Sequence, residues 1–538
     1  MSIFRSPDQA NFNAIIKAHM AKPDAPLLLE GTTGLGKTRA YLSAVMQAAE
    51  SGKRIAIALP SHQLIDQLLS SSDLAVIELG GVSVMAFKPA SFFENRKAYT
   101  EHKDSVLRSD VMLCTCASVI IDHRLKGGYH GVVDRDYIVF DEADQLPASA
   151  ALQSDCVITS AQFKELGIKV ETAEQAVRAA LAKKDVEPEV KAQALMILEA
   201  VQEPAWFHKT GVTDDGGVML FHQMPGRLLK QVANQSNVAF ISATLSIAGS
   251  FDDFKRAMGI QSVSKLSNTI EPIKHGKLHF HVSDLEVDTP EWLGIVQKTV
   301  DEAMRPTLIV TPSHELAQTL GSVMPNAVVR QSEETTSEAA NRMGKADVLI
   351  AAGAWAGLDT KVRWASVVVP KIPFEKPVIL DGHQESHFLN SRNTAVRRMR
   401  QVIGRGLRSP DAESHVYILD GRSKAIESFV PKRFLSQWAE KGFMEGARVE
   451  LTLSKLERDP TVRKKALSHY GQDCMACGFK PKHISQIDVH HLFPLSEGGE
   501  RLTSIRDVAV LCATCHRLAH STKPPMTVEA MKIVNDYC

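Results

Sequence analysis

Residues 31–38 have the types and spacing of a phosphate-binding loop. They read Gly-Thr-Thr-Gly-Leu-Gly-Lys-Thr, which fits Gly-x4-Gly-Lys-[Ser/Thr], between a short apolar run and a helix-like segment. Glycines let backbone N–H groups point at phosphate oxygens, and a following helix adds a favourable dipole. The lysine would reach the terminal phosphates, and the hydroxyl after it would hold Mg²⁺. The candidate phosphate-binding residues are Gly31, Thr32, Thr33, Gly34, Leu35, Gly36, Lys37 and Thr38.

An acidic motif follows the apolar run 137–140. Asp141 comes directly after that run and Glu142 comes next, in the sequence Asp-Glu-Ala-Asp. A carboxylate at a strand end beside a phosphate loop is where Mg²⁺ needs a second protein ligand, and Asp141 fits that role. Glu142 would then orient or deprotonate an attacking water. Alone the motif could equally be a solvated loop, but the phosphate loop favours a nucleotide-hydrolysing site.

Four of the eight cysteines form two Cys-x-x-Cys pairs near the C-terminus. Four thiolates in two pairs close a tetrahedral zinc site with no open position, so this zinc is expected to be structural. Eight cysteines in a chain of this length do not make a disulfide framework. The expected zinc ligands are Cys474, Cys477, Cys512 and Cys515.

The composition limits the class of protein. The chain has 538 residues, enough for three or four domains at about 100–200 residues each, and 44% of them are hydrophobic. The 62 basic and 62 acidic residues cancel, which excludes a globally basic nucleic-acid coat but leaves room for local positive grooves. No uncharged apolar run approaches about 18 residues, and the N-terminus lacks a signal-peptide apolar region. We therefore expect a cytoplasmic protein with no membrane partner.

Short apolar runs occur in two series along the chain. Runs of four or five residues rich in Val and Ile suit strands covered on both faces by helices, so two series predict two doubly wound α/β lobes. The stretch from about 149 to 235 lacks such runs and includes a segment rich in Ala, Glu, Lys and Leu, which predicts a largely helical insertion. The expected strands are 26–29, 55–59, 111–114, 137–140 and 238–241, then 307–310, 348–351, 366–369 and 416–419.

Four further motifs follow the acidic motif in order. They are Ser-Ala-Thr-Leu at 242–245, Trp-Ala-Gly-Leu-Asp at 355–359, Lys-Ile-Pro-Phe at 371–374 and Gln-Val-Ile-Gly-Arg-Gly-Leu-Arg at 401–408. With the phosphate loop and the acidic motif, they make the chain resemble the superfamily 2 helicases of the DinG/XPD type over about residues 1–430. The resemblance implies two RecA-like lobes that use ATP and Mg²⁺ to move 5′→3′ along single-stranded DNA.

The last of these motifs carries the cations expected from the second lobe. Phosphoryl transfer needs positioning and charge neutralisation, so cations from the facing lobe complete the site on closure. Arg405 and Arg408, three residues apart on an expected helix, suit that role, with Gln401 one turn earlier. A solvated basic face is the alternative, because further arginines lie at 397–400. The resemblance also places Asp359 at the cleft or on the nucleic-acid strand, and Gln9 resembles a glutamine upstream of the loop in related helicases.

Three departures from the family pattern matter. Asp144 stands where this branch usually has His, and Ala356 stands where it usually has Glu. The family commonly places four iron–sulfur cysteines between the phosphate loop and the acidic motif, whereas this chain has Cys114 and Cys116 there. Their spacing in a strand-like run favours small buried thiols. We therefore expect no iron–sulfur cluster, and another structure in residues of about 82–108 at the position of that domain.

The last histidines lie around the second cysteine pair. A double histidine, a proline and Gly-Gly precede the pattern Leu-Cys-x-x-Cys-His-x3-His, so residues 470–522 resemble the HNH nucleases with a ββα-metal core. His516 and His520 face one way on a helix, and with His490 they would offer three nitrogen ligands to Mg²⁺, Mn²⁺ or another divalent metal. The family assigns the general base to His491, while Asp507 replaces the family's Asn. A module that keeps its zinc and binds DNA without cutting is the alternative.

The two resemblances imply an ATP-dependent DNA helicase fused to a metal-dependent HNH endonuclease, acting on single-stranded and duplex DNA. A compact motor without the cluster cysteines resembles the DinG helicases of type IV CRISPR systems, which implies recruitment by an RNA-guided CRISPR effector complex. A stand-alone phage-defence or repair helicase–nuclease and a DNA-remodelling motor remain alternatives. The expected domains are a first lobe at 1–260, a second lobe at 261–448, a linker at 449–466 and an HNH domain at 467–538.

Overall fold

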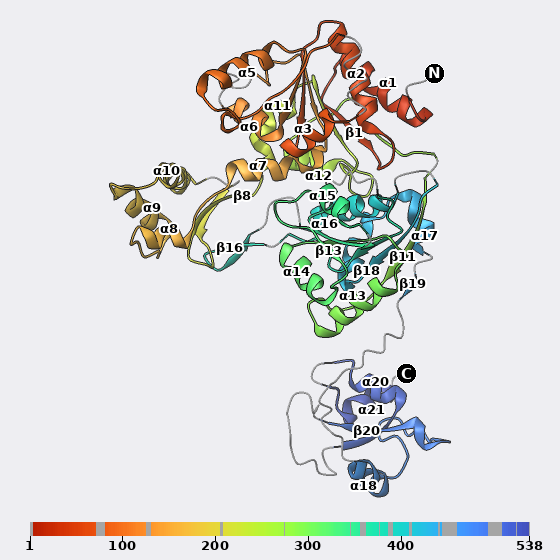
Figure 1. Ribbon diagram of the computed structural model, residues 1–538. Helices are drawn as coiled ribbons and strands as arrows, with labels where there is room; N and C mark the ends of the chain where they lie inside the picture. The colour runs from red at the N-terminus through yellow and green to blue at the C-terminus, as the bar shows by residue number, and fades with distance from the viewer. Residues whose placement is uncertain are drawn as a thin grey trace. The chain divides into compact units, whose positions relative to one another are not determined.

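The computed structural model forms two compact units, Met1–Ala447 and Arg448–Cys538 (Figure 1). It describes residues 4–71, 81–124, 131–204, 208–273, 275–344, 346–355, 362–375, 377–385, 391–407, 411–439, 442–443, 460–492, 508–522 and 525–536. No helix in these ranges is long and apolar enough to cross a membrane.

The first lobe is a parallel seven-stranded sheet with helices on both faces. Its strand order is β10-β1-β9-β5-β2-β4-β3. Strands β1, β2, β4, β5 and β9 coincide with the expected apolar runs and are buried along their whole length, because helices pack on both sides. The strands are β1 (Leu27–Gly31), β2 (Ile55–Leu59), β3 (Val84–Ala86), β4 (Val111–Thr115), β5 (Tyr137–Phe140), β9 (Val238–Ser242) and β10 (Asn268–Ile270).

Two hydrophobic clusters hold these helices to the sheet. One cluster joins it to α1 (Pro7–Ala21), α2 (Lys37–Glu50) and α3 (His62–Leu69). The other joins it to α6 (Cys116–Arg124), α7 (Leu146–Ser154), α11 (Lys230–Ala233) and α12 (Asp252–Met258). In the stretch from 82 to 108, β3 adds an edge strand beside β4 and α5 (Arg96–Arg108) leads back into β4.

The second lobe repeats this design. Its parallel sheet has the order β13-β14-β12-β15-β18-β11-β19. The strands are β11 (Lys277–Val282), β12 (Thr307–Thr311), β13 (Val328–Val329), β14 (Val348–Ala352), β15 (Ser366–Val369), β18 (Glu413–Ile418) and β19 (Gly442–Phe443). The helices are α13 (Pro290–Glu302), α14 (His314–Val323), α15 (Thr336–Arg342), α16 (Ser391–Ile403) and α17 (Leu435–Ala439).

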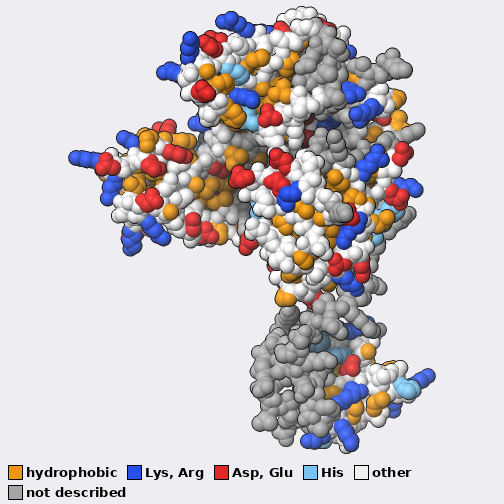
Figure 2. All heavy atoms as spheres, in the orientation of Figure 1, with side chains coloured by type: hydrophobic (Ala, Val, Ile, Leu, Met, Phe, Trp, Pro, Cys, Tyr) orange, Lys and Arg blue, Asp and Glu red, His pale blue; other side chains and the backbone are white. Residues whose placement is uncertain are grey.

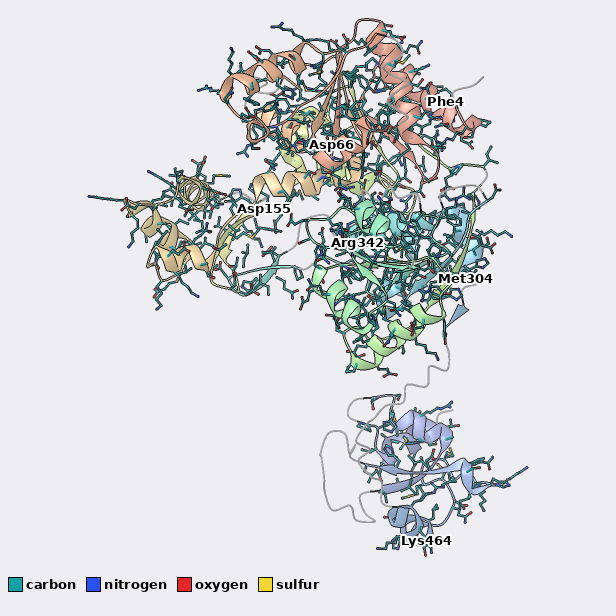
Figure 3. All side chains as sticks on the ribbon, in the orientation of Figure 1. Phe4, Asp66, Asp155, Met304, Arg342 and Lys464 are labelled. Carbon is teal, nitrogen blue, oxygen red and sulfur yellow. The ribbon has the colours of Figure 1, made fainter. Side chains whose placement is uncertain are left out.

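An insertion, residues 155–222, leaves the first lobe after α7. Asp155 lies at this exit (Figure 3), where its carboxylate accepts a hydrogen bond of 2.8 Å from the His222 N–H. The expected helices are present, but the insertion also contains a three-stranded antiparallel sheet in the order β6-β8-β7. The sheet arises because a Gly-Gly turn at 216–217 allows β7 and β8 to pair. The elements are β6 (Cys156–Ile158), α8 (Ser160–Glu165), α9 (Ala173–Ala182), α10 (Pro188–Gln202), β7 (His208–Val212) and β8 (Val218–His222).

A hairpin of the second lobe contacts this insertion. The hairpin, which we call the clasp, consists of β16 (Val378–Leu380) and β17 (His383–Glu385) and lies beside the insertion in Figure 1. The Asp381 N–H donates to the Val212 carbonyl at 2.8 Å, and the Val212 N–H donates to the Asp381 carboxylate at 2.9 Å. Lys209 forms an ion pair of 2.5 Å with Glu385. The clasp therefore connects the two lobes at a second place, away from their main contact.

The second unit is a small ββα domain. Strands β20 (Ile487–His491) and β21 (Val508–Cys512) are antiparallel, and α20 (Ala513–Ala519) follows β21 directly. A hydrophobic cluster joins these elements to helices α18 (Pro460–Tyr470) and α21 (Val528–Asp536), for example through Met531 of α21. The expected linker 449–466 thus ends in the first turns of α18, while residues 449–459 lie outside the described ranges.

Candidate active sites

The phosphate loop connects β1 to α2. Gly34 and Gly36 have φ values of 89° and 78°, a left-handed conformation that residues with a Cβ rarely adopt. A Cβ on Gly36 would lie 2.5 Å from the side-chain nitrogen of Gln9. Lys37 and Thr38 begin α2 and are half-buried at the mouth of the loop. The residues therefore fit a loop whose backbone N–H groups receive phosphate oxygens.

Gln9 holds this loop from α1. Its side-chain nitrogen donates to the Gly36 carbonyl at 2.8 Å, and its oxygen accepts from the Arg5 N–H at 2.7 Å. Only 1% of the residue is exposed. In this structure Gln9 shapes the loop, and its expected contact with adenine stays a prediction.

The acidic motif lies at the carboxyl end of β5. The Tyr41 hydroxyl, from the helix that follows the phosphate loop, donates to the Asp141 carboxylate at 2.8 Å. Burial, and then the charge of Glu142, raise the pKa of Asp141 to about 6, while Lys37 acts in the opposite direction. A buried carboxylate between an anion and a cation is stabilised in its charged form when a further cation binds. Asp141 therefore fits a Mg²⁺ ligand.

Asp144 joins the two lobes. The Ser242 hydroxyl of the first lobe donates to its carboxylate at 2.5 Å, and the Gln401 amide of the second lobe donates at 3.1 Å. Burial, and then Glu142, raise the pKa of Asp144 to about 6. Gln401, expected at the nucleotide site, thus contacts the acidic motif through Asp144. Asp144 is the residue that stands where the family usually has His.

One face of α16 lies against the first lobe. Arg397 donates to the Asp253 carboxylate at 2.8 Å and to the Thr244 carbonyl at 3.1 Å, and Asn393 donates to Asp253 at 2.8 Å. Only 4% of Arg397 is exposed. The side chain of Arg400 is 9% exposed. Two of the neighbouring arginines that suggested a solvated basic face for Arg405 and Arg408 are therefore buried against the first lobe, while that alternative stays untested for Arg405 and Arg408 themselves. The spacing of residues 393, 397 and 400 on one helix face could have indicated this contact.

Glu30 was missed by the sequence analysis. It is the penultimate residue of β1, just before the phosphate loop, and is fully buried. It accepts hydrogen bonds from Ser246 at 2.6 Å and from Arg400 at 2.7 Å. Arg400 also donates to the Ser246 carbonyl at 2.6 Å. A glutamate after three leucines is the available signal, because a buried charge requires a partner.

The expected arginines of the last motif have different outcomes. Arg405 donates to the Trp355 carbonyl within its own lobe. Arg408 and Asp359 lie outside the described residues. Gly404 contacts the phosphate loop so closely that a Cβ there would lie 2.6 Å from the Thr33 side chain. The segment therefore reaches the loop through its backbone, while Arg405 is directed to Trp355.

A cavity of about 1440 Å³ lies in the second lobe and extends to the insertion and the clasp. The Arg398 guanidinium stacks 4.9 Å from the Trp355 ring centre, and that of Arg422 stacks 4.9 Å from Phe374. Figure 2 shows basic and acidic side chains intermingled over the displayed face, so this surface is not uniformly basic. The wall of the cavity includes Lys371, Trp355, Phe374, Arg398, Arg422, Phe221 of the insertion and Val378 of the clasp.

The two cysteines at the iron–sulfur position are core residues. Cys114 lies in β4 and Cys116 begins α6, so they belong to different elements rather than to one strand. Both are fully buried, as expected. Burial raises the pKa of Cys114 to about 12, which keeps it a neutral thiol. The absence of an iron–sulfur cluster stays a prediction.

The four C-terminal cysteines converge in the second unit. Their sulfur atoms lie within 4.8 Å of one another, and those of Cys477 and Cys512 are 3.8 Å apart. Cys512 and Cys515 flank the start of α20, while Cys474 and Cys477 precede β20. The four converging thiols, with no fifth donor in the group among the residues that the structure describes, match a closed tetrahedral zinc site.

Three histidines converge beside them. The ligand atoms of His490, His516 and His520 lie within 4.8 Å of one another, and His490 is 3% exposed. Asp488 lies two residues before His490 on β20, and its carboxylate is 3.1 Å from Nδ1 of His516. This carboxylate fixes one ring nitrogen, so the other is available to a metal. The side chain of His491 and the whole of Asp507 lie outside the described residues.

Comparisons with known proteins identify three domains in the chain. A DEAD/DEAH box helicase domain matches residues 7–167, a helicase C-terminal domain matches 297–441, and an HNH endonuclease domain matches 474–522. A comparison with curated protein sequences finds no match.

Solved structures share the fold of the first unit. A structure described as "XPD_Helicase" has a TM-score of 0.58 at 14% identity and covers 82% of this chain and 100% of its own. One described as "XPD_APO" has a TM-score of 0.55 at 13% identity, covering 80% and 99%. A structure of Xpd4 from S. tokodaii has a TM-score of 0.52 at 13% identity, covering 81% and 99%. The chain is therefore an ATP-dependent helicase with the XPD fold, joined in one polypeptide to a C-terminal HNH endonuclease domain.

Proposed function

We propose that this protein moves 5′→3′ along single-stranded DNA by ATP hydrolysis and cuts DNA with its HNH domain. The observation that carries the motor is the contact of α16 with the acidic motif and with Glu30, because it joins the lobes around the phosphate loop. The 5′→3′ direction rests on the family resemblance alone.

In the proposed nucleotide site, Lys37 holds the terminal phosphates and Thr38 and Asp141 hold Mg²⁺, which neutralises phosphate charge when bound. Glu142 orients the attacking water and accepts its proton as the new oxygen–phosphorus bond forms and the bond to the leaving diphosphate breaks. Gln401 and Asp359 line the same cleft, and Arg405 and Arg408 stabilise the charge on closure. Gln9 contacts the base.

The cavity of the second lobe is the proposed path of the strand. Trp355 and Phe374 offer rings on which bases stack, and each ring carries an arginine at 4.9 Å. Lys371 adds a further cation for the DNA backbone. Contacts of this kind tolerate any sequence and weaken as salt rises.

In the proposed nuclease site, His490, His516 and His520 would hold a divalent metal, which when bound would supply positive charge for the scissile phosphate. His491 takes the proton from the attacking water. The four cysteines would hold zinc, which fixes the segment before β20 to the start of α20, and these two elements carry the histidines. A metal with three protein ligands keeps positions open for substrate.

The recruiting partner is proposed to be an RNA-guided complex of the type IV CRISPR class. This step rests on the family resemblance, since a compact DinG-like motor with an HNH domain is found in that setting. A helicase–nuclease that recognises DNA ends or forks unaided is the second candidate. Cleavage that requires the guide complex separates the two.

The test follows cleavage of a labelled DNA bubble with Mg²⁺ or Mn²⁺, with and without ATP. Lys37→Ala and His491→Ala are compared with wild type and with two exposed controls, Lys298→Ala and His469→Ala. We expect cutting to disappear in His491→Ala and to extend along the DNA with ATP only when Lys37 is intact. ATP turnover that survives Lys37→Ala would contradict the motor, and cutting that survives His491→Ala would contradict the nuclease site.

A further inference from the structure

Arg433 of the second lobe reaches the phosphate loop of the first. It lies in a short 3-10 turn, Lys432–Phe434, and its guanidinium donates to the Thr32 hydroxyl at 2.5 Å. The two residues are 401 positions apart in the chain. Thr32 is the second residue of the loop, so Arg433 brings a positive charge to the edge of the expected phosphate site.

The neighbours of Arg433 hold its side chain in place. Its guanidinium lies 4.8 Å from the ring centre of Phe434, which is 1% exposed and packs against His275 at 5.1 Å. The Nε atom is buried and has no hydrogen-bond partner among the described residues. Burial lowers the pKa of Arg433 to about 10; the charge of Glu271 opposes this shift, and the charge of Arg400 adds to it. A cation that is costly to bury in this way favours an anion beside it.

Arg433 differs from the other arginines at the contact between the lobes. Arg397 and Arg400 are neutralised by Asp253 and Glu30. Among the described residues no carboxylate lies within 4.0 Å of Arg433, and its recorded polar contact is a neutral hydroxyl. Arg405 is directed to the Trp355 carbonyl. Of these four, Arg433 is the one whose guanidinium contacts the phosphate loop itself, through Thr32.

We propose that Arg433 contacts the terminal phosphate of bound ATP from the second lobe and so makes lobe closure depend on the triphosphate. This inference rests on the proposed nucleotide site. The contact with Thr32 holds the guanidinium at the loop before ATP arrives, and the phosphate then supplies the anion. ADP lacks the terminal phosphate, so it does not gain this contact.

The decisive variant is Arg433→Gln, whose amide can still donate to Thr32 but has no charge. Affinities for a non-hydrolysable ATP analogue and for ADP are measured by fluorescence titration of the full chain. We expect Arg433→Gln to weaken binding of the analogue by about 10- to 100-fold and binding of ADP by less than about twofold. Arg433→Lys keeps the charge and should lie between wild type and Arg433→Gln.

The control is Lys424→Ala, an exposed lysine of the second lobe that pairs with Asp284 and should bind both nucleotides as wild type does. Equal weakening of both nucleotides in Arg433→Gln, or no weakening, would overturn the inference. If Arg433→Gln melts below wild type, Arg433→Lys decides: loss confined to the analogue supports the contact and any other pattern overturns it. Failure of wild type to bind ATP, or normal turnover in Lys37→Ala, would instead reject the proposed nucleotide site.

Discussion

Asp488 shows how one carboxylate can set the chemistry of a metal site. On a strand, residues two apart face the same side, so Asp488 and His490 both point towards the helix that carries His516. Asp488 contacts Nδ1 of His516 and thereby leaves Nε2 for the metal. Such outer carboxylates fix the ring orientation and raise the basicity of the ligand.

Replacing Asp488 by Asn should therefore weaken metal binding at the three-histidine site. We expect about a 10- to 100-fold loss of affinity for Mn²⁺, measured by calorimetric titration of the zinc-loaded protein. Glu529→Gln, an exposed carboxylate change on α21, is the matched control and should leave the affinity unchanged. Equal affinities in Asp488→Asn and wild type would remove Asp488 from the site.

At this scale the sequence predicted residues whose spacing is local. The phosphate loop, the acidic motif, and the cysteine and histidine groups each lie within one short segment or in two matching segments. Arg400 and Arg433 were not predicted as contacts of the first lobe, because their partners Glu30 and Thr32 lie 370 and 401 positions away. Only the folded chain brings these residues together.

Helix α16 is the element that joins the lobes. Its buried ion pair between Arg397 and Asp253 has side chains that are 5% and 7% exposed. Removing one partner of such a pair leaves a buried charge, which is far more destabilising than replacing both by apolar residues.

We expect Arg397→Ala to cost about 3–5 kcal/mol, which lowers the Tm of the full chain by several degrees. The double variant Arg397→Met with Asp253→Leu should recover most of that loss. Arg178→Ala removes an exposed pair with Glu174 and should change stability by less than about 1 kcal/mol. Differential scanning calorimetry of the three variants checks this, and equal Tm values for Arg397→Ala and Arg178→Ala would contradict it.

Among the elements, continuous apolar runs were predicted well and alternating ones were not. All nine expected strands are present. Eight of them are buried on both faces and consist mainly of apolar residues, whereas β18 alternates between buried and partly exposed positions. Strand β11 was missed: its sequence Lys-Leu-His-Phe-His-Val alternates, with Leu278, Phe280 and Val282 buried. The sheet of the insertion was missed for a related reason, since its short strands pair only across the turn at 216–217.

In the first unit, the two lobes, the insertion and the clasp are joined by a ring of contacts. The chain runs from the first lobe into the insertion, the clasp joins the insertion to the second lobe, and α16 joins the second lobe to the first. The cavity has walls from the insertion, the clasp and the second lobe. We expect a strand bound in that cavity to pass inside this ring of contacts.

With a disulfide across the clasp, ATP hydrolysis should therefore respond to linear DNA but not to circular DNA. Thr213 and Leu380 form an antiparallel bridge between insertion and clasp, a pairing close enough for a disulfide once both are cysteine. We expect the oxidised variant to hydrolyse ATP in response to linear single-stranded DNA but not to circular single-stranded DNA. The same variant after reduction is the control and should respond to both. Equal stimulation by circles before and after reduction would contradict a closed ring.

The clasp also has a consequence for how long the enzyme stays on DNA. If a DNA strand passes inside the ring of contacts, the enzyme can slide along the strand but can leave it only at an end of the strand or when the ring opens. Opening breaks the Lys209–Glu385 ion pair and a few hydrogen bonds around Asp381. The residence time on a long strand is then set by the rate at which the ring opens rather than by the affinity of the cavity for DNA. Salt that weakens the contacts with the DNA backbone would let the enzyme slide more freely. It would not release the enzyme until it also broke the contacts of the clasp.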